Sequence, residues 1–229
     1  MAEHRSSALR GLYLITPDDI DTPRLVARVA AVLPGAALLQ YRNKAADAPL
    51  RREQAMALLQ LCRQLGVPLL VNDDWRLAAE IGADGAHLGG GDGAIGEARA
   101  ALGAGAILGA SCYGELTRAG AAATAGASYV AFGAFFPSTT KPGAPRADPA
   151  LLAQAAALGL PRAAIGGITP DNARQLVDAG ADLLAVIGAV FDAADPVCAA
   201  QRLRACFEPA SASGTRHAHA PPHLQTRTP

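Results

Sequence analysis

Eight short, mostly apolar runs alternate along this chain with stretches of helical period, and this alternation constrains the fold more than any other feature. The runs are continuously apolar, which is typical of parallel strands buried on both faces. Between the first two runs, Leu25, Val29, Val32 and Leu33 follow the spacing of an amphipathic helix. The predicted strands cover residues 11–16, 37–42, 68–73, 85–89, 106–112, 129–133, 162–168 and 183–190.

Eight strand–helix units without a break in composition predict one closed (β/α)8 TIM barrel. An open doubly wound α/β sheet is the alternative. Asp21-Thr22-Pro23 and Thr169-Pro170-Asp171 each place a capping residue before a first-turn proline, and they predict two of the helix starts. The barrel domain covers residues 11–207. A short extension, 1–10, precedes it, and a tail rich in Ser, Pro, Thr and His, 208–229, is predicted to be disordered.

The formal net charge is zero, so no strong field attracts nucleic acid or an anionic membrane surface. No apolar stretch approaches the roughly 20 residues of a membrane span, and the first residues lack a secretory pattern. The four cysteines have no metal-binding or redox spacing; Cys62, Cys198 and Cys206 are expected on apolar helix faces. These features favour a cytoplasmic protein that binds neither nucleic acid nor membrane, and they leave homo-oligomer formation open.

Only two of the twenty basic side chains are lysines, Lys44 and Lys141. A chain with this bias towards arginine is expected to keep lysine where a compact point charge has a particular use. Lys141 follows Ser138, Thr139 and Thr140, and a lysine beside several hydroxyls suggests a site for phosphate oxygens.

Polar and glycine residues stand where most of the predicted strands end. In a parallel barrel these carboxyl ends form the face that carries the active site, so the residues there are candidates for one common site. Independent solvated loop residues are the alternative explanation. The candidates are Gln40, Arg42, Lys44, Asn72, Asp73, Asp74, Asp92, Ser111, Ser138, Thr139, Thr140, Lys141, Gly166, Gly167, Ile187 and Gly188.

Two anion sites are predicted on this face. In the first, Arg42 and Lys44 lie near the carboxylates Asp73 and Asp92, which would repel a phosphate unless a hard divalent ion stood between them. Mg²⁺ binds one or two carboxylates and uses substrate phosphates as further ligands. Asp73 and Asp92 are therefore predicted to bind Mg²⁺ together with a diphosphate, although either residue alone could instead be a helix N-cap.

The second predicted site follows the last two strands. Gly166-Gly167 allows close approach of the backbone, and Ile187-Gly188 can supply N–H groups to a phosphate monoester. Close packing between strand and helix is the alternative reading of the same glycines.

In their order along the chain, six short motifs resemble those of the thiamine-phosphate synthase family. The match covers nearly all of residues 11–207. The motifs are Gln40-Tyr41-Arg42-Asn43-Lys44, Val71-Asn72-Asp73, His87-Leu88-Gly89 with Asp92, Gly109-Ala110-Ser111, Phe136-Pro137-Ser138-Thr139-Thr140-Lys141 and Ile165-Gly166-Gly167-Ile168.

The resemblance implies a TIM-barrel transferase that joins a hydroxymethylpyrimidine diphosphate to a thiazole phosphate, releasing pyrophosphate. It implies that Arg42, Lys44, Ser111 and Lys141 act in catalysis and that Asp73 and Asp92 bind Mg²⁺. The implied pyrimidine-diphosphate residues are Gln40, Arg42, Lys44, Asn72 and Ser111. The implied thiazole-phosphate residues are Ser138, Thr140, Gly167, Ile187 and Gly188. Tyr41, Asn43 and Thr139 lie within these motifs and are included as substrate-binding candidates.

The chain departs from the family pattern at several positions. The family usually has Glu at the position of Asn43, Leu at Tyr41, Thr at Ser138 and Ser at Gly188. Two alternatives remain open: a thiazole tautomerase of the same barrel type, and a barrel that only binds thiazole phosphate. His87 also has two interpretations, as a packed histidine at a strand end or as a catalytic group.

Overall fold

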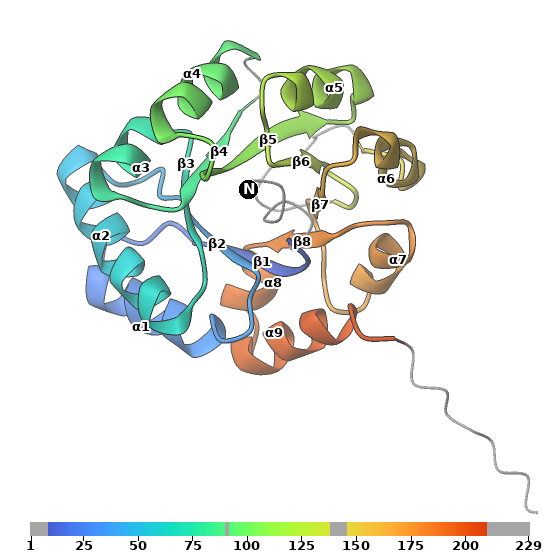
Figure 1. Ribbon diagram of the computed structural model, residues 1–229. Coiled ribbons are helices and arrows are strands. Elements are labelled where there is room, and N and C mark those ends of the chain that lie inside the picture. The colour runs from blue at the N-terminus through green and yellow to red at the C-terminus, as the bar shows by residue number, and fades with distance from the viewer. Residues whose placement is uncertain (1–8, 90–91, 138–145, 210–229) are drawn as a thin grey trace, which may run out of the picture.

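The computed structural model describes residues 9–89, 92–137 and 146–209, without the side chains of 92–94, and its centre is a closed barrel of eight parallel strands. The strands pair in chain order, and β8 closes the barrel against β1. Helices surround the strands on the outside (Figure 1). The predicted TIM barrel is therefore confirmed. The strands are β1 (Gly11–Ile15), β2 (Leu38–Tyr41), β3 (Leu69–Asn72), β4 (Gly85–Leu88), β5 (Ile107–Tyr113), β6 (Tyr129–Phe132), β7 (Arg162–Ile165) and β8 (Leu183–Val186).

Of the two helix starts predicted from capping residues, the one after Asp21 is confirmed. The Asp21 carboxylate accepts a hydrogen bond from the backbone N–H of Arg24 at 2.8 Å and caps the first helix. None of the described helices combines the length and hydropathy that a bilayer crossing needs. They are α1 (Thr22–Val32), α2 (Ala48–Leu65), α3 (Trp75–Ile81), α4 (Asp92–Leu102), α5 (Leu116–Thr124), α6 (Ala150–Gln154) with the 3-10 turn η2 (Ala155–Leu158), α7 (Ala173–Asp178), α8 (Gly188–Phe191) and α9 (Pro196–Ala205).

Three predicted boundaries near the end of the chain are wrong. The strand predicted over 162–168 ends at Ile165, and the next two residues, Gly166 and Gly167, leave the β region with φ values of +99° and +64°. The strand predicted over 183–190 ends at Val186, and α8 begins two residues later. The helix expected to start at Pro170, after a cap at Thr169, starts at Ala173 instead, and the side chain of Asn172 accepts a hydrogen bond from the Thr169 N–H at 2.8 Å.

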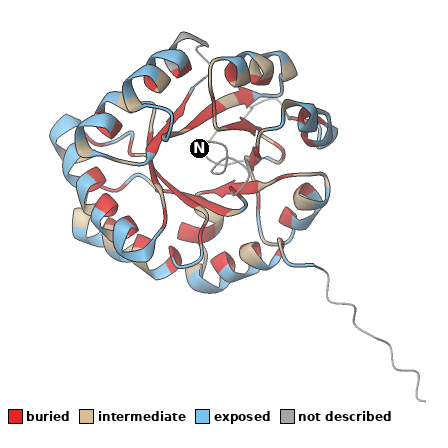
Figure 2. Cartoon of the chain, viewed as in Figure 1, coloured by how far each residue is buried: buried red, intermediate tan, exposed pale blue. Residues whose placement is uncertain are grey.

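Buried side chains form two separate clusters, one on each side of the strands. The barrel-interior cluster contains Tyr13, Leu38, Leu70 and Tyr129 among others. The sheet–helix cluster contains the alternate strand residues and the inward faces of the helices, which appear red in Figure 2. Because side chains alternate along a strand, burial on both sides explains why the strands read as continuous apolar runs.

The expectation for the cysteines holds at two of the three helix positions. Cys62 and Cys206 are buried, but Cys198 is exposed. The buried face of α9 consists of Ala199, Ala200 and Leu203, and Cys198 lies outside it in the first turn. Cys112, on β5, is fully buried on the helix-facing side of the barrel.

Arg99, near the end of α4, joins the loops that precede β5 and β6. Its guanidinium donates to the carbonyl oxygens of Gly103 at 2.8 Å, Ala106 at 2.8 Å and Gly126 at 2.8 Å, and to the Ser128 hydroxyl at 3.0 Å. These loops lie at the amino ends of the strands, opposite the face where barrels carry their active sites. We therefore infer that Arg99 stabilises the fold rather than acting in the active site.

We expect Arg99→Lys to lower the free energy of unfolding by about 2 kcal/mol, because one ammonium group cannot satisfy acceptors spread over two loops. Urea denaturation followed by circular dichroism measures the change. The control is Arg52→Lys, whose side chain makes one exposed ion pair with Glu80 at 2.6 Å. That exchange is expected to change the free energy of unfolding by less than about 0.5 kcal/mol. Equal effects in the two variants would contradict the role given to Arg99.

Candidate active site

A cavity of about 630 Å³ opens at the carboxyl ends of the strands. Each of the eight strands, or the loop directly after it, supplies at least one lining residue. The cavity brings together eight of the sequence-predicted candidates. These are Gln40, Arg42, Asn72, Ser111, Gly166, Gly167, Ile187 and Gly188.

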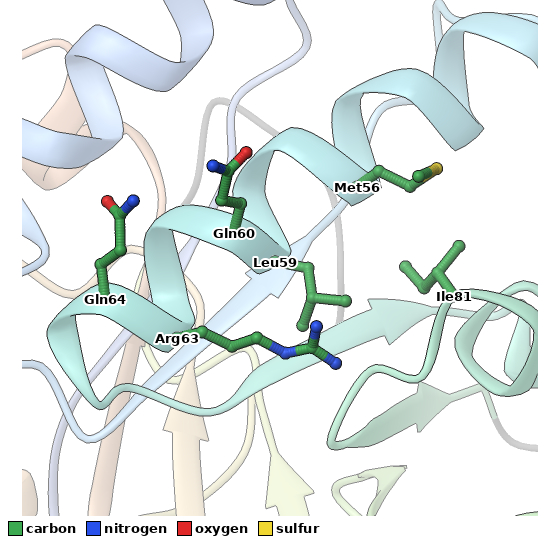
Figure 3. A pocket seen from close by; sticks show the side chains of 6 residues that line it. All are labelled: Met56, Leu59, Gln60, Arg63, Gln64 and Ile81. Atoms are coloured by element: carbon green, nitrogen blue, oxygen red, sulfur yellow. The ribbon is translucent and has the colours of Figure 1, made fainter.

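A second depression lies on the outer wall of the barrel, between α2 and α3 (Figure 3). Its lining contains one charged side chain, Arg63, and otherwise amide and apolar groups such as Gln60, Met56 and Ile81. It is formed by the flanks of helices and holds none of the strand-end residues. The cavity at the strand ends is therefore the candidate active site.

Arg42 is held at the rim of the cavity by the loop after β1. Its guanidinium donates to the Asp18 carboxylate at 3.0 Å, and only 16% of its side chain is exposed. The same carboxylate oxygen accepts from the backbone N–H of Lys44 at 2.8 Å, which orders the residues after β2. The Lys44 residue is exposed beside this rim. Asp18 thus anchors the guanidinium of Arg42 and the backbone of Lys44.

Tyr41 and Asn43 do not line this cavity. Tyr41 belongs to the sheet–helix cluster, and its hydroxyl donates to the Gln54 side chain at 2.9 Å. The amide of Asn43 donates to the same Gln54 oxygen at 2.9 Å and to the Asp19 carbonyl at 2.6 Å. Because side chains alternate, Gln40 and Arg42 face the interior while Tyr41 and Asn43 face the helices. Both outward residues therefore contact Gln54 of α2 rather than the cavity.

The residues after β3 present a carboxylate on a constrained backbone. Asp73 has φ +61°, in the left-handed region, where Asp is one of the few tolerated side chains. Its backbone N–H donates to the carbonyl of His87 at 2.8 Å, and one carboxylate oxygen accepts from the Asn72 amide at 2.8 Å. Asp74 instead caps α3, accepting from the Leu77 N–H at 2.9 Å. The two neighbouring aspartates therefore have different tasks.

The other predicted metal ligand, Asp92, is the first residue of α4, and its side chain lies outside the described part of the structure. The other carboxylate oxygen of Asp73 lies near Gly89, just after β4. A Cβ atom added at Gly89 would stand 3.7 Å from this oxygen, so the glycine leaves space beside it. Among the described residues no three Asp, Glu, His or Cys side chains form a group suited to a metal ion. A two-carboxylate site completed by phosphate oxygens is compatible with that arrangement.

A chain of hydrogen bonds crosses the cavity floor from β2 to β5. Gln40 Nε2 donates to the Tyr13 hydroxyl, which lies 2.7 Å from the Tyr129 hydroxyl. The Tyr129 oxygen lies 2.8 Å from His87 Nδ1, and His87 Nε2 lies 2.9 Å from the Ser111 hydroxyl. His87 is therefore packed within a polar network, and Tyr13 and Tyr129 are site residues that the sequence analysis missed.

Burial sets the protonation states of the titratable side chains in this hydrogen-bonded chain. It raises the pKa of the Tyr13 and Tyr129 hydroxyls above the ordinary value for tyrosine. It lowers the pKa of His87 to about 4, partly offset by the charge of Asp73. At neutral pH all three groups are therefore uncharged, and each hydroxyl carries one proton that it can donate.

The region after β7 and β8 is lined by backbone. An added Cβ atom would lie 2.2 Å from the Pro137 carbonyl oxygen at Gly167 and 2.4 Å from the Ala134 side chain at Gly166. Glycine is therefore required at both positions. Gly188 begins α8, where N–H groups have no partner within the helix. The predicted hydroxyl and lysine residues of this site, Ser138, Thr139, Thr140 and Lys141, lie outside the described residues.

Two further lining residues were also missed. Tyr113 has φ +53° and is 48% exposed at the cavity mouth, and Arg118 lies 5.6 Å from its ring centroid. The Asp192 carboxylate lies over Gly188, 2.7 Å from where a Cβ atom would stand. A residue in a strained backbone conformation beside a cavity is a common feature of functional sites. The pairing register shifts between Ser111 and Tyr113, which a pattern of apolar residues does not reveal.

Comparison with known proteins identifies relatives along almost the whole barrel. The family described as thiamine monophosphate synthase matches residues 12–190. The thiamine-phosphate synthase of Xanthomonas campestris pv. campestris (strain 8004) is 61% identical over 198 residues, 86% of this chain and 96% of that protein. The thiamine-phosphate synthase of Azoarcus sp. (strain BH72) is 60% identical over 202 residues, 87% of this chain and 98% of that protein. Among solved structures, a thiamine phosphate pyrophosphorylase from Pyrococcus furiosus aligns with a TM-score of 0.74 at 34% identity, covering 86% of this chain and 94% of its own.

Proposed function

The chain belongs to the thiamine-phosphate synthase family, and we propose that its cavity holds a hydroxymethylpyrimidine diphosphate beside a thiazole phosphate. A transferase of this family joins the two and releases pyrophosphate. The observation that carries the proposal is the content of one cavity: Gln40, Arg42, Asn72 and Ser111 on one side and Gly167 on the other. A site for the thiazole phosphate alone would not need the first group.

The diphosphate is assigned to the rim formed by β2, β3 and β4. Arg42 and Lys44 would neutralise its charge, and Asn72 orients the Asp73 carboxylate through the 2.8 Å hydrogen bond described above. Asp73 and Asp92 offer the hard oxygen ligands that Mg²⁺ prefers, so the residues present fit this ion. When bound, Mg²⁺ supplies positive charge that favours departure of the diphosphate. This assignment gives Asp73, held in its left-handed conformation, a task that explains its strain.

The thiazole phosphate is assigned to the region after β7 and β8. The close approach of backbone at Gly167 and the N–H groups in the first turn of α8 suit a phosphate monoester. Ile187 lines the same part of the cavity, and Ser138, Thr139 and Thr140 are proposed to add hydroxyl donors. A glycine at 188 in place of the family's usual serine keeps the backbone donor and loses only a side-chain one.

We propose a dissociative displacement. The carbon–oxygen bond to the diphosphate breaks with its electron pair going to the leaving group, and the pyrimidine methylene becomes electron-poor. Arg42, Lys44 and Lys141 stabilise the negative charge on the leaving group, and no covalent nucleophile is needed. The 4-amino group of the pyrimidine delocalises the positive charge. The thiazole nitrogen, oriented by its anchored phosphate, then donates its lone pair to form the new carbon–nitrogen bond.

Mixing both substrates with the protein is expected to release pyrophosphate only when a divalent cation is present. A chelator should abolish the release, and added Mg²⁺ should restore it. A thiazole tautomerase or a binding protein would release no pyrophosphate under any of these conditions, so that result would overturn the proposal. Omitting the thiazole tests the mechanism separately: slow capture of the pyrimidine by water supports dissociation, whereas a strictly concerted isotope-effect pattern contradicts it.

The cysteines fit a reducing compartment. Within the part of the chain that the structure describes, Cys62, Cys198 and Cys206 are free thiols. We therefore propose a cytoplasmic location for the enzyme. Formation of a homo-oligomer stays a prediction that size-exclusion chromatography can check.

A further inference from the structure

Four of the five side chains in the hydrogen-bonded chain across the cavity floor line the cavity, and only Tyr129, in the middle, does not. Gln40 and Ser111 line the cavity at its two ends. Between them the Tyr129 side chain is fully buried in the barrel-interior cluster, and Tyr13 is 1% exposed. The two phenol rings meet edge to face, with centroids 5.8 Å apart at 84°, so their hydroxyls are held against each other by packing.

Each link of this chain has one proton, so the whole chain can run in only two directions. In the forward direction, Gln40 Nε2 donates to Tyr13, Tyr13 to Tyr129, Tyr129 to His87 Nδ1, and His87 Nε2–H to Ser111. In the reverse direction, Ser111 donates to His87 Nε2, and every later bond is inverted, which requires the carbonyl oxygen of Gln40 at Tyr13. The two directions therefore present opposite polar groups to the cavity. The forward direction leaves an acceptor at Gln40 and a donor at Ser111, and the reverse direction leaves a donor at Gln40 and an acceptor at Ser111.

The orientation of the Gln40 amide favours the forward direction, and the geometry of the other side chains allows it to continue. Nε2 of Gln40 is the atom that lies against the Tyr13 hydroxyl. Tyr13 then needs an acceptor for its own proton, and among the described residues only the Tyr129 oxygen, at 2.7 Å, provides it. Tyr129 in turn donates its proton to His87 Nδ1 at 2.8 Å. The proton of the neutral imidazole is then on Nε2, 2.9 Å from the Ser111 hydroxyl.

We propose that Tyr13, Tyr129 and His87 are positioning residues that fix the hydrogen-bond polarity of the pyrimidine site by holding this chain in the forward direction. Gln40 then presents its carbonyl oxygen to the cavity as an acceptor. Ser111 accepts from His87 and presents its own proton as a donor. The inference rests on the proposed function for the identity of the substrate, but the direction of the hydrogen bonds is a property of the free protein.

An aminopyrimidine matches this polarity. Its exocyclic amino group donates, and its unprotonated ring nitrogens accept. Exchanging the amino group for an oxo group turns that donor into an acceptor and places a proton on a ring nitrogen. A site with fixed polar groups rejects such an analogue strongly, because buried groups are left without partners. The chain therefore explains how the site would select a 4-aminopyrimidine over its 4-oxo counterpart.

The tautomer of His87 distinguishes the two directions without any substrate. We expect ¹⁵N NMR of the free protein at pH 7 to show a neutral ring with its proton on Nε2. A proton on Nδ1, or a charged imidazolium, would overturn the proposal. In Tyr129→Phe the fixed tautomer should give way to a mixture of both, whereas Tyr41→Phe, which removes a buried hydroxyl on the other side of β2, should leave the His87 signals unchanged.

Substrate preference gives the second readout. The ratio of kcat/KM for the amino diphosphate over its 4-oxo analogue is expected to fall about 10- to 100-fold in Tyr129→Phe and in His87→Leu. It should stay within about threefold of wild type in Tyr41→Phe. His87→Gln should recover most of the preference, because its amide nitrogen lies as many bonds from Cα as Nε2 and can still donate to Ser111.

An unchanged ratio in Tyr129→Phe would overturn the coupling between the chain and the substrate. Loss of the preference in His87→Gln equal to that in His87→Leu would overturn the donor role of His87. If the amino diphosphate gives no turnover while His87 carries its proton on Nε2, the proposed function fails and the direction of the chain stands.

Discussion

Replacing Asp73 with asparagine is expected to lower turnover about a thousandfold while leaving thiazole-phosphate binding within about threefold of wild type. The change removes one negative charge and keeps the shape of the side chain. It therefore weakens the metal site without disturbing the left-handed turn at φ +61° or the hydrogen bond of its backbone N–H to His87. Pyrophosphate release at saturating Mg²⁺ measures the first effect, and calorimetric titration with thiazole phosphate measures the second.

The next residue provides the matched control. Asp74→Asn makes the same chemical change one position along, but Asp74 caps α3 and asparagine caps a helix equally well. We expect its turnover to stay within about twofold of wild type. Asp92→Ala, at the start of α4, is expected to behave like Asp73→Asn. Full activity in either variant would remove the basis for the metal assignment, and a large loss in Asp74→Asn would show that the effect is structural.

Gly109→Ala should lower the free energy of unfolding by about 3 kcal/mol, which corresponds to a Tm about 6 to 12 °C lower. Gly109 lies on β5 and faces the barrel interior. An added Cβ atom would stand 2.2 Å from the Tyr129 hydroxyl and 2.5 Å from His87 Nδ1. These are the two atoms that share a 2.8 Å hydrogen bond. The methyl group therefore overpacks the interior and separates the middle of the polar chain.

Gly105→Ala tests whether the effect belongs to this position. Gly105 lies four residues earlier, and nothing stands within 4 Å of its added Cβ atom. The expected change in the free energy of unfolding is less than about 0.5 kcal/mol. Urea denaturation and thermal unfolding followed by circular dichroism compare the two variants. A Gly109→Ala protein as stable as the control would mean that the interior can relax around the methyl group, and the close contact would lose its significance.

Much of the candidate site followed from the sequence because strand ends in a parallel barrel meet on one face. Gln40, Arg42, Asn72 and Ser111 are predicted at the ends of three different strands, and one cavity collects them. Tyr41 and Asn43 are substrate-binding candidates only because they stand inside a sequence motif. Strict alternation along β2 could have separated them from Gln40 and Arg42, since the two pairs have opposite parity.

Tyr13 and Tyr129 show what the sequence could not indicate. Each lies in an apolar strand, 116 residues apart, and nothing local distinguishes a packed tyrosine from one in a polar network. Closure of the barrel brings β1, β4 and β6 together across its interior, and the missing side chain at Gly109 leaves room for the hydroxyl–imidazole contact. The same holds for Arg99, whose acceptors come from two different loops.

The sequence by itself determined the eight strand–helix units, the barrel, the family and the strand-end chemistry, because apolar periodicity and short motifs are local and read in chain order. Only the tertiary structure decided which side of each strand faces the cavity, how Asp18 anchors Arg42, and that five side chains form one chain of hydrogen bonds. These features depend on the register and closure of the barrel, which place residues from distant strands within hydrogen-bonding distance.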